Sequence, residues 1–480
     1  MPEIESWASD LPGTYKWKAL GTVAMGTIMA AMDMSIVNLA FPTLTRVFNT
    51  DLATVLWVTL AYVLVNVSIM LIIGRVSDFL GRRRIYVLGI SIFSLGILAS
   101  ALAQSIGQLI FFRCLQAVGG AMIISCGAAI VTEAFPEKEM GKGLGFLGVA
   151  VSIGFICGPM VGGLLLDWMD WRAVFYMRFP VGFITVLMAV FLLEKDQGSP
   201  GKIRVDLVGA FASSAGLLCL VFGLNQIRKL GAGSAWVWLS IGTGFFFLVI
   251  FTLFESRTDD PIVDLSLFKN RDFSSATGSL FLTFVAAPAF ILIMPFYLIE
   301  GLGLSPSTAG LFFAVNSTVT MLIGPASGWL SDRFGSRWFS GLGSGLMAVS
   351  FFLMRGFDLE VGFTEIVLVL ALLGVGIGMF QAPNNSSIMA AVPRNHLGTA
   401  SALIATIRQV GLSLGMALAG TLFSASRVVH QMALRDGGVD AIQAVGLSIP
   451  LAFHEVLLIS AFLNLLAAFL SLTTGRKGLS

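Results

Sequence analysis

The 480-residue sequence has few charged residues, few histidines and few cysteines. Asp, Glu, Lys and Arg make up 12% of the chain, whereas hydrophobic residues make up 56% and the mean hydropathy is +0.89. A soluble protein carries about 25% charged residues, so this composition excludes a soluble globular chain and predicts an all-α, polytopic membrane protein. The net charge of +2 gives no basic field, and we expect no nucleic-acid partner.

The sequence also lacks the residue patterns of an enzyme. Its three histidines, His396, His430 and His454, have no metal-ligand spacing, and no Gly-x-x-x-x-Gly-Lys phosphate loop occurs. We therefore predict no catalytic residues, no metal site and no ATP-derived energy. The four cysteines all lie within apolar runs, which argues against a disulfide framework.

Long apolar runs bounded by charge, Pro or Gly occur throughout the chain. The first run has no basic segment or cleavage site of a signal peptide, and we interpret it as an uncleaved span. Together the runs predict fourteen transmembrane helices, at 17–41, 53–75, 85–103, 107–132, 143–166, 172–193, 207–225, 234–254, 273–298, 306–330, 338–355, 363–391, 399–424 and 451–473.

Basic residues gather on one side of these predicted spans. An even number of spans puts both termini on the same side. Of the 29 Lys and Arg residues, nineteen lie on the side of the termini, seven lie opposite, and three (Arg113, Arg178 and Arg408) lie within spans. The positive-inside rule predicts both termini in the cytoplasm. We expect a cell-membrane protein, in a prokaryotic inner or plasma membrane.

Two short loops share one sequence pattern. Gly74–Arg84 reads Gly-Arg-Val-Ser-Asp-Phe-Leu-Gly-Arg-Arg-Arg, and Gly328–Arg337 reads Gly-Trp-Leu-Ser-Asp-Arg-Phe-Gly-Ser-Arg. The glycines permit close helix ends and tight turns, and the Asp can pair with Arg or cap a helix. Two copies at matched places indicate an internal repeat rather than two ordinary basic turns. We predict a gating loop made of Gly74, Asp78, Gly81, Arg82, Arg83 and Arg84, with Asp332, Gly335 and Arg337 in the second copy.

The spacing of the repeat predicts the domain organisation. Asp78 and Asp332 are 254 positions apart, so spans 1 to 6 correspond to spans 9 to 14. We predict an N-terminal six-helix bundle over 1–194, a linker with inserted helices 7 and 8 over 195–271, and a C-terminal six-helix bundle over 272–480. The polar segment 426–450 is expected outside the membrane, with a short amphipathic helix near 428–434.

Several of these stretches resemble motifs of a known transporter family. The Gly74–Arg84 loop resembles the loop motif of the major facilitator superfamily. Met-Asp-Met-Ser-Ile-Val-Asn-Leu-Ala-Phe-Pro, which contains Asp33, resembles the first-span signature of the 14-span drug:proton antiporter branch. Three further stretches, 170–172, 301–310 and 408–415, also look like that branch. An antiporter motif is expected at Gly154, Gly158, Pro159, Gly162 and Gly163.

The resemblance implies two six-helix major-facilitator bundles with a substrate site near the membrane midplane between them. It also implies that the span-5 motif forms an interface between the halves that seals against ion leak. An ordinary small-residue packing face describes the same contacts without sealing. One position departs from the branch, because Arg178-Phe179-Pro180 stands where Asn-x-Pro is usual. This cation puts broad specificity for cationic drugs in doubt.

Charged residues within spans are the candidates for proton coupling. A charge in mid-span costs about 2.5–3.5 kcal/mol, so each such residue needs a partner or a task. At helical rise, Asp33, Arg113 and Arg178 lie roughly 9 to 12 Å from the outer ends of their spans and can share one layer. We hypothesise that Asp33 carries the proton, ionised against Arg113 and neutralised when a proton arrives from outside. The alternative is a static buried pair that fixes the fold.

Polar residues on the same and other spans are candidates for a substrate cavity. Interhelical hydrogen bonds that only hold helices together explain such residues equally well. In span 4, Gln116 lies beneath Arg113 on one helical face, and the resemblance makes this the proton-relay helix. The predicted cavity residues are Asn38, Gln116, Arg178, Gln381, Asn384, Asn385 and Arg408.

These observations lead to one main hypothesis and two alternatives. The main hypothesis is a proton-coupled antiporter that exports small amphipathic compounds by alternating access, as in multidrug efflux, with the gating loop latching the cytoplasmic side. The first alternative is a dedicated transporter of one anionic or zwitterionic metabolite, with Arg178 as counter-ion. The second is a lipid translocator or a membrane sensor that does not transport. We expect a functional monomer in a lipid bilayer, a small-molecule substrate, and no cofactor except the proton as coupling ion.

Overall fold

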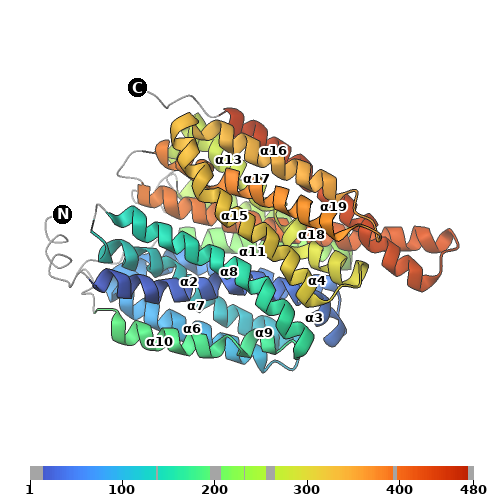
Figure 1. Ribbon diagram of the computed structural model, residues 1–480, viewed down its shortest axis with the longest axis horizontal. Coiled ribbons are helices and arrows are strands. Elements are labelled where there is room, and N and C mark those ends of the chain that lie inside the picture. The colour runs from blue at the N-terminus through green and yellow to red at the C-terminus, as the bar shows by residue number, and fades with distance from the viewer. Residues whose placement is uncertain are drawn as a thin grey trace. The chain divides into compact units, whose positions relative to one another are not determined.

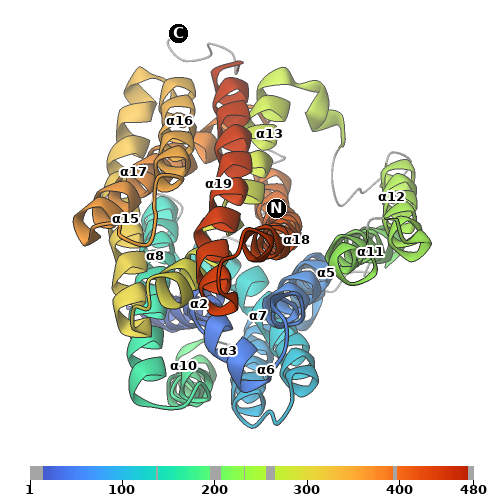
Figure 2. The same cartoon turned by 90° about the vertical axis from the view of Figure 1, so that its right-hand side faces the viewer.

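The computed structural model describes residues 14–136, 139–194, 207–231, 233–255, 265–392 and 397–473, and these residues form helices and no β-strand (Figures 1 and 2). Twelve helices in this part of the chain are long and apolar enough to cross a membrane. The predicted all-α, polytopic fold is therefore confirmed, but the count of fourteen spans is not supported.

Two helices that coincide with predicted spans are not among the twelve. In α11 (Leu207–Leu230), only Phe211–Leu224 is an uninterrupted stretch of described side chains, and this stretch is too short to be counted as a span. In α16 (Ser336–Met354), four serines, three glycines and an arginine lower the mean hydropathy. The composition of α16 therefore accounts for its absence from the twelve, whereas α11 is only partly described.

Contacts within the chain divide it into two units. Unit 1 consists of the residues up to Ala40 together with Trp57–Ala210, and unit 2 of Phe41–Leu56 together with Phe211–Ser480. The predicted three-part division at 194/195 and 271/272 stays a prediction. Unit 1 contains α2 (Tyr15–Leu39), α5 (Trp57–Leu80), α6 (Arg82–Ala101), α7 (Ile106–Ala134), α8 (Met140–Trp168), α9 (Ala173–Tyr176) and α10 (Phe179–Leu192).

Unit 2 holds the remaining helices and most of α11. The span Arg271–Gly301 is interrupted by wider, π-helical turns next to Pro288 and Pro295, which have no backbone N–H to donate. Its helices are α3 (Phe41–Val47), α4 (Leu52–Val55), α12 (Ala235–Glu255), η2 (Leu265–Lys269), α13 (Arg271–Ala286), η3 (Ala289–Ile293), α14 (Met294–Phe296), η4 (Tyr297–Gly301), α15 (Pro306–Phe334), α16, α17 (Phe363–Ala390), α18 (Leu397–Asp436) and α19 (Ala441–Thr473).

The two loops of the internal repeat have the same backbone conformation. Gly81, between α5 and α6, has φ 94° and ψ 129°, and Gly335, between α15 and α16, has φ 92° and ψ 129°. L-residues rarely adopt this conformation, whereas glycine does so without strain. The predicted role of both glycines in tight turns is confirmed.

We expect Gly335→Ala to destabilise unit 2 by about 1–3 kcal/mol, the usual cost of a sparsely populated backbone conformation. No atom lies within 4 Å of a Cβ added at Gly335, so the effect comes from the backbone alone. Thermal unfolding followed by size-exclusion chromatography measures it. Gly21→Ala in α2 is the matched control, because Gly21 also has open space but lies within a regular helix. Equal melting temperatures for the two variants would contradict the expectation.

An asparagine makes a similar hydrogen bond in each half, although Asn66 and Asn316 are 250 positions apart, four fewer than Asp78 and Asp332. Asn66 of α5 donates its side-chain N–H to the carbonyl of Ala117 in α7, at 3.4 Å. Asn316 of α15 donates in the same way to the carbonyl of Leu370 in α17, at 3.3 Å. Each half thus ties its second predicted span to its fourth with an asparagine.

The small residues of the antiporter motif pack against α2. A Cβ at Gly154 would meet the carbonyl oxygen of Ile28 at 2.6 Å, and one at Gly158 would meet the Ser35 hydroxyl oxygen at 2.0 Å. Gly162 faces Ile36 in the same way. The face that the resemblance assigned to an interface between the halves therefore contacts α2 within its own unit. In unit 2, Gly411 and Gly415 of α18 pack in the same way against Phe281, Phe284 and Val285 of α13.

The expected short helix near 428–434 is not separate. Helix α18 continues without a break to Asp436, and the chain then turns at Gly437 and Gly438 into α19. Gly438 has φ 85°, a left-handed conformation that ends the helix. Figure 1 shows the two helices in red as one hairpin. The polar residues of this segment thus lie on extended helices rather than in a loop.

Candidate functional site

Asp33 of α2 lies at the centre of a buried polar cluster in unit 1. Its side chain is completely buried, within the candidate span Tyr15–Leu39. Arg113 Nη1 donates to its Oδ2 at 2.6 Å, and Arg178 Nη1 donates to its Oδ1 at 2.5 Å. Gln116 Nε2 donates to the same Oδ1 at 2.9 Å. Three side chains from two other parts of the unit therefore hold one carboxylate.

Helix α7 presents Arg113 and Gln116 to Asp33 from the same face. The two residues are three positions apart, and Arg113 Nη1 also donates to Gln116 Oε1 at 2.7 Å. Arg113 Nε donates to the carbonyl oxygen of Val58 at 3.1 Å, and the guanidinium carbon lies 4.4 Å from the centre of the Tyr62 ring. The position of Arg113 is thus fixed by the Val58 carbonyl and the Tyr62 ring of α5 and by the Gln116 amide of α7.

Arg178 reaches Asp33 because the chain breaks between α9 and α10. Pro180, in the first turn of α10, has no N–H to donate, and Arg178 is the N-terminal cap residue. Its Nε donates to the carbonyl oxygen of Val174 at 2.8 Å. A cation is disfavoured at a helix N-terminus, so the contact with Asp33 offsets an otherwise unfavourable position.

The cluster has more positive than negative charge. One carboxylate, Asp33, faces two guanidinium groups, Arg113 and Arg178, so the formal charge of the three is +1. Within the described part of the chain, Nη2 of each arginine, the Tyr62 hydroxyl and Asn66 Oδ1 are buried without a hydrogen-bond partner. The cluster therefore keeps spare donors beside its central ion pairs.

The structure places the predicted proton-coupling residues together. Asp33, Arg113 and Arg178 share one layer, as their distances from the span ends predicted. Asn38, a predicted cavity residue, accepts a hydrogen bond from the Thr59 hydroxyl at 3.2 Å and so ties α2 to α5. The roles of these residues in proton and substrate binding stay predictions.

The remaining predicted cavity residues lie in unit 2. Asn384 of α17 donates to the carbonyl oxygen of Ala276 in α13 at 3.1 Å, which is a helix-packing contact. Arg408 of α18 is half-buried, with its guanidinium carbon 5.1 Å from the centre of the Phe284 ring. In the described residues no hydrogen bond joins these residues to one another or to Gln381 and Asn385. The structure therefore does not assemble them into one polar cluster.

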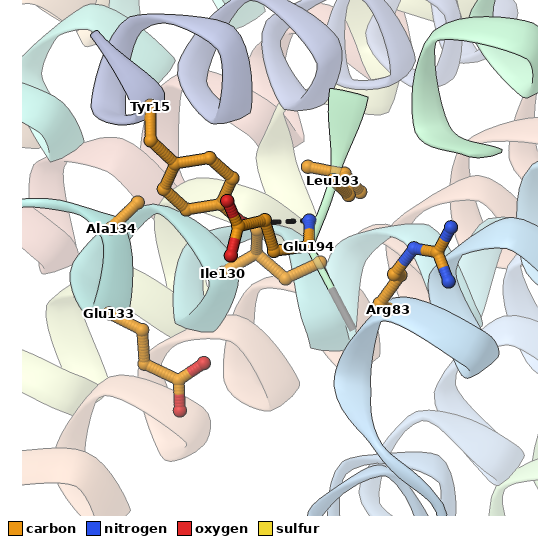
Figure 3. A pocket seen from close by; sticks show the side chains of 7 residues that line it. All are labelled: Tyr15, Arg83, Ile130, Glu133, Ala134, Leu193 and Glu194. Atoms are coloured by element: carbon orange, nitrogen blue, oxygen red, sulfur yellow. Dashed lines mark hydrogen bonds between the residues drawn. The ribbon is translucent and has the colours of Figure 1, made fainter. Parts of the chain in front are cut away.

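The gating-loop arginines make contacts at the end of unit 1 where α2 begins. Arg82 Nη1 lies 2.5 Å from Glu133 Oε1, and Arg83 donates to the carbonyl oxygen of Val190 at 2.5 Å. The Tyr15 hydroxyl accepts from the Glu194 backbone N–H at 3.2 Å. The side chains of Asp78 and Asp332 lie outside the described residues, so the predicted latch stays a prediction. Figure 3 shows the small pocket beside these contacts, lined by Tyr15, Arg83, Ile130, Glu133, Ala134, Leu193 and Glu194.

Sequence reasoning missed the contribution of α5 to the cluster. Tyr62 stacks on Arg113, and Asn66, four residues later, holds α7 one turn further along. A tyrosine and an asparagine at helical spacing within an apolar run were the available signal. A single tyrosine in such a run is more often a core residue, so this signal alone does not identify a functional site.

Sequence reasoning also missed a second ionic cluster, in unit 2. Glu300 lies 3.4 Å from Arg427 and 3.8 Å from Arg46, and His430 lies 2.9 Å from Glu455. These groups are partly exposed, and such pairs contribute little to stability. The buried cluster around Asp33 is therefore the stronger candidate for the functional site.

Comparisons with known proteins identify the family. The family model described as Major Facilitator Superfamily matches residues 23–416 and 276–477. The chain is 31% identical to the riboflavin transporter RibZ of Clostridioides difficile, over 87% of this chain and 90% of the relative. It is 30% identical to the multidrug resistance protein Stp of Mycobacterium tuberculosis (84% and 74% covered) and 29% identical to the tetracenomycin C resistance and export protein of Streptomyces glaucescens (88% and 78% covered).

Solved structures share the fold at low sequence identity. An inward-facing, unoccupied bacterial homolog of the human lysosomal transporter Spinster has a TM-score of 0.67 at 18% identity, with 96% of this chain and 99% of that chain covered. A peptide transporter POT has a TM-score of 0.68 at 14% identity, with 97% and 98% covered. With a family model matching nearly its whole length, the chain belongs to the major facilitator superfamily of membrane transporters.

Proposed function

We propose that the chain is a proton-coupled transporter of small amphipathic compounds, of the multidrug-efflux type, and that it works by alternating access. The observation that carries the proposal is the completely buried Asp33, held inside a membrane span by Arg113, Arg178 and Gln116. The burial of a charged carboxylate within a membrane span costs free energy, so a residue of this kind indicates a functional site. The names of relatives that confer multidrug resistance or export an antibiotic support efflux.

The available energy is sufficient for this function. One charge that crosses a potential of 100 mV releases about 2.3 kcal/mol. A hundredfold gradient of a neutral compound costs about 2.7 kcal/mol. One or two protons per transported molecule therefore suffice, and the proposal needs no cofactor. We also propose that the protein functions as a monomer. Both termini are expected in the cytoplasm, as the distribution of basic residues predicts.

The direction of coupling depends on the charge of the transported compound. A cation competes with the proton for Asp33, so the two alternate on the site and move in opposite directions. This is antiport, and with the usual inward proton gradient it exports the compound. The antiporter of the main hypothesis is thus the expected form for an amphipathic cation.

Transport by purified protein in liposomes tests the proposal. Liposomes with an acidic interior should accumulate ethidium, an amphipathic cation, as protons leave, and accumulation should stop when nigericin collapses the pH gradient. Protein-free liposomes are the control. Equal ethidium accumulation with and without the pH gradient would contradict proton coupling. If ethidium, riboflavin and an aromatic sulfonate all failed to move, the alternative of a membrane sensor would replace the proposal.

A second candidate function is favoured by a specific contact. Arg178 Nη1 lies 2.5 Å from Asp33 Oδ1, so a cation occupies the place beside the carboxylate where a cationic compound would bind. This contact favours a transporter of an anionic or zwitterionic metabolite, with Arg178 as its counter-ion.

A further inference from the structure

The charge of the Asp33 cluster indicates the class of molecule that the site accepts. We infer that the transported molecule carries an oxyanion, such as a carboxylate, sulfonate or phosphate, which binds to Arg178 and Arg113 while Asp33 takes up a proton. The inference rests on the proposed function only in its use of Asp33 as the proton site, and it develops the second candidate function, an anion bound by Arg178, in place of the antiport of a cation. It specifies the substrate class of that site and the sign of its coupling.

The excess positive charge is the first argument. Asp33, Arg113 and Arg178 are at least 96% buried, and together they carry a formal charge of +1. A buried charge without a counter-charge is costly, so an added anion stabilises this cluster whereas an added cation is repelled.

The spare donors are the second argument. Nη2 of Arg113 and Nη2 of Arg178 are buried and have no acceptor among the described residues, and neither has the Tyr62 hydroxyl. Guanidinium groups bind oxyanions through paired, charge-assisted hydrogen bonds. Nη1 of each arginine already holds one oxygen of Asp33. An incoming oxyanion can therefore bind the free Nη2 atoms and displace Asp33 from Nη1.

Competition between the two anions sets the sign of the coupling. An ionised Asp33 and a bound oxyanion compete for the same guanidinium groups. A proton on Asp33 removes this competition, so the proton and the oxyanion favour each other's binding, and by linkage the effect is reciprocal. The two then cross the membrane together, which is co-transport rather than antiport.

No other charged group changes this balance in the described part of unit 1. The groups that face Asp33 are Arg113 and Gln116 of α7, Arg178 at the start of α10, and Tyr62 of α5. Helix α8 packs against α2 through glycines, and its stretch 143–166 contains no charged residue. Asp33 is therefore the acid whose proton responds to an anion at this site.

A pair of probes with permanent charges tests the inference on the wild-type protein. The probes are 2-naphthalenesulfonate and trimethyl(2-naphthyl)ammonium, whose charges do not change with pH. The purified protein in weakly buffered detergent should bind the sulfonate with uptake of protons, seen with a pH indicator. Its affinity should rise by about 5- to 150-fold between about pH 8 and about pH 5, the range of typical coupling between sites. Preferential binding of the ammonium, with proton release, would overturn the inference.

Matched variants locate the effect. Arg178→Asn should weaken sulfonate binding by about ten- to a hundredfold, as expected for the loss of charge-assisted hydrogen bonds. Arg172→Asn, which removes the same charge six residues earlier from a side chain that is 40% exposed, should leave binding unchanged. Asp33→Asn should bind the sulfonate without proton uptake and with an affinity independent of pH. Equal affinities of the two arginine variants would contradict the assignment to Arg178.

The outcomes separate this inference from the proposed function. Sulfonate binding that depends on Arg178 but takes up no proton would refute Asp33 as the proton site and leave the anionic class standing. Absence of sulfonate binding, together with ethidium transport that depends on the pH gradient, would refute the anionic class and leave the proposed function standing. The wild-type measurement needs no variant, so a variant that fails to fold does not prevent the test.

Discussion

Asp33→Asn should abolish proton-driven transport. Asparagine keeps the shape of the side chain and an oxygen that accepts hydrogen bonds, but it does not bind or release a proton at any pH between about 5 and 8. The groups that contact the carboxylate are Arg113, Arg178 and Gln116, and none of them carries a negative charge. No neighbouring group in the described cluster can therefore replace the charge of Asp33. Ethidium accumulation and substrate-induced proton flux in liposomes measure the loss, which should reach the level of protein-free liposomes.

Controls for this variant address folding. Asp33→Asn leaves two buried guanidinium groups without a counter-charge, and breaking such a pair costs about 3–5 kcal/mol of stability. We therefore expect a lower melting temperature than the wild type, and transport is compared only for protein that elutes as a single peak. Asp33→Glu keeps the carboxylate and should retain part of the coupling. Gradient-driven transport by a folded Asp33→Asn protein would refute the proton-carrying role.

Gly119→Ala should severely weaken the packing of α7 against α6. An added Cβ would lie 2.4 Å from the backbone nitrogen of Phe93 and 2.5 Å from the carbonyl oxygen of Gly89, both in α6. Backbone atoms cannot relieve such a clash by a change of rotamer, as side-chain atoms can. Helices α6 and α7 must therefore move apart. Overpacking usually costs about 1–3 kcal/mol and occasionally more, and we expect the upper end. Thermal unfolding and the yield of monodisperse protein measure the effect.

Gly107→Ala on the same helix is the matched control. No atom lies within 4 Å of a Cβ added there, and alanine is favoured over glycine in a helix by about 1 kcal/mol. The control should therefore be neutral or slightly stabilising. Equal melting temperatures of the two variants would show that α6 and α7 are not in close contact at Gly119.

The sequence predicted the features that rest on strong local rules. Gly81 and Gly335 were assigned to tight turns because their pattern repeats, and both have the same left-handed φ. Asp33, Arg113 and Arg178 were placed in one layer because charges in apolar runs are costly and helical rise fixes their depth. Both predictions needed only residue identity and spacing.

Features that depend on packing or on helix continuation were not predictable in this way. The fourteen-span count is not supported, in part because Ser and Gly in α16 reduce its apolar character, although Ser340 and Ser344 are buried. Segment 426–436 is polar and was expected to form only a short separate helix near 428–434, whereas α18 continues through it. Polarity indicates that a segment faces water, but it does not distinguish a loop from an exposed helix.

The hairpin of α18 and α19 has a practical consequence for imaging. A small transporter lies almost wholly within its detergent micelle, and electron microscopy then has little external density with which to align particles. Gly437 and Gly438 form an exposed turn between two continuous helices, and exposed turns of this kind tolerate insertions. A rigid helical protein fused at this turn would provide an alignment mark without disturbing the Asp33 cluster, which lies in the other unit.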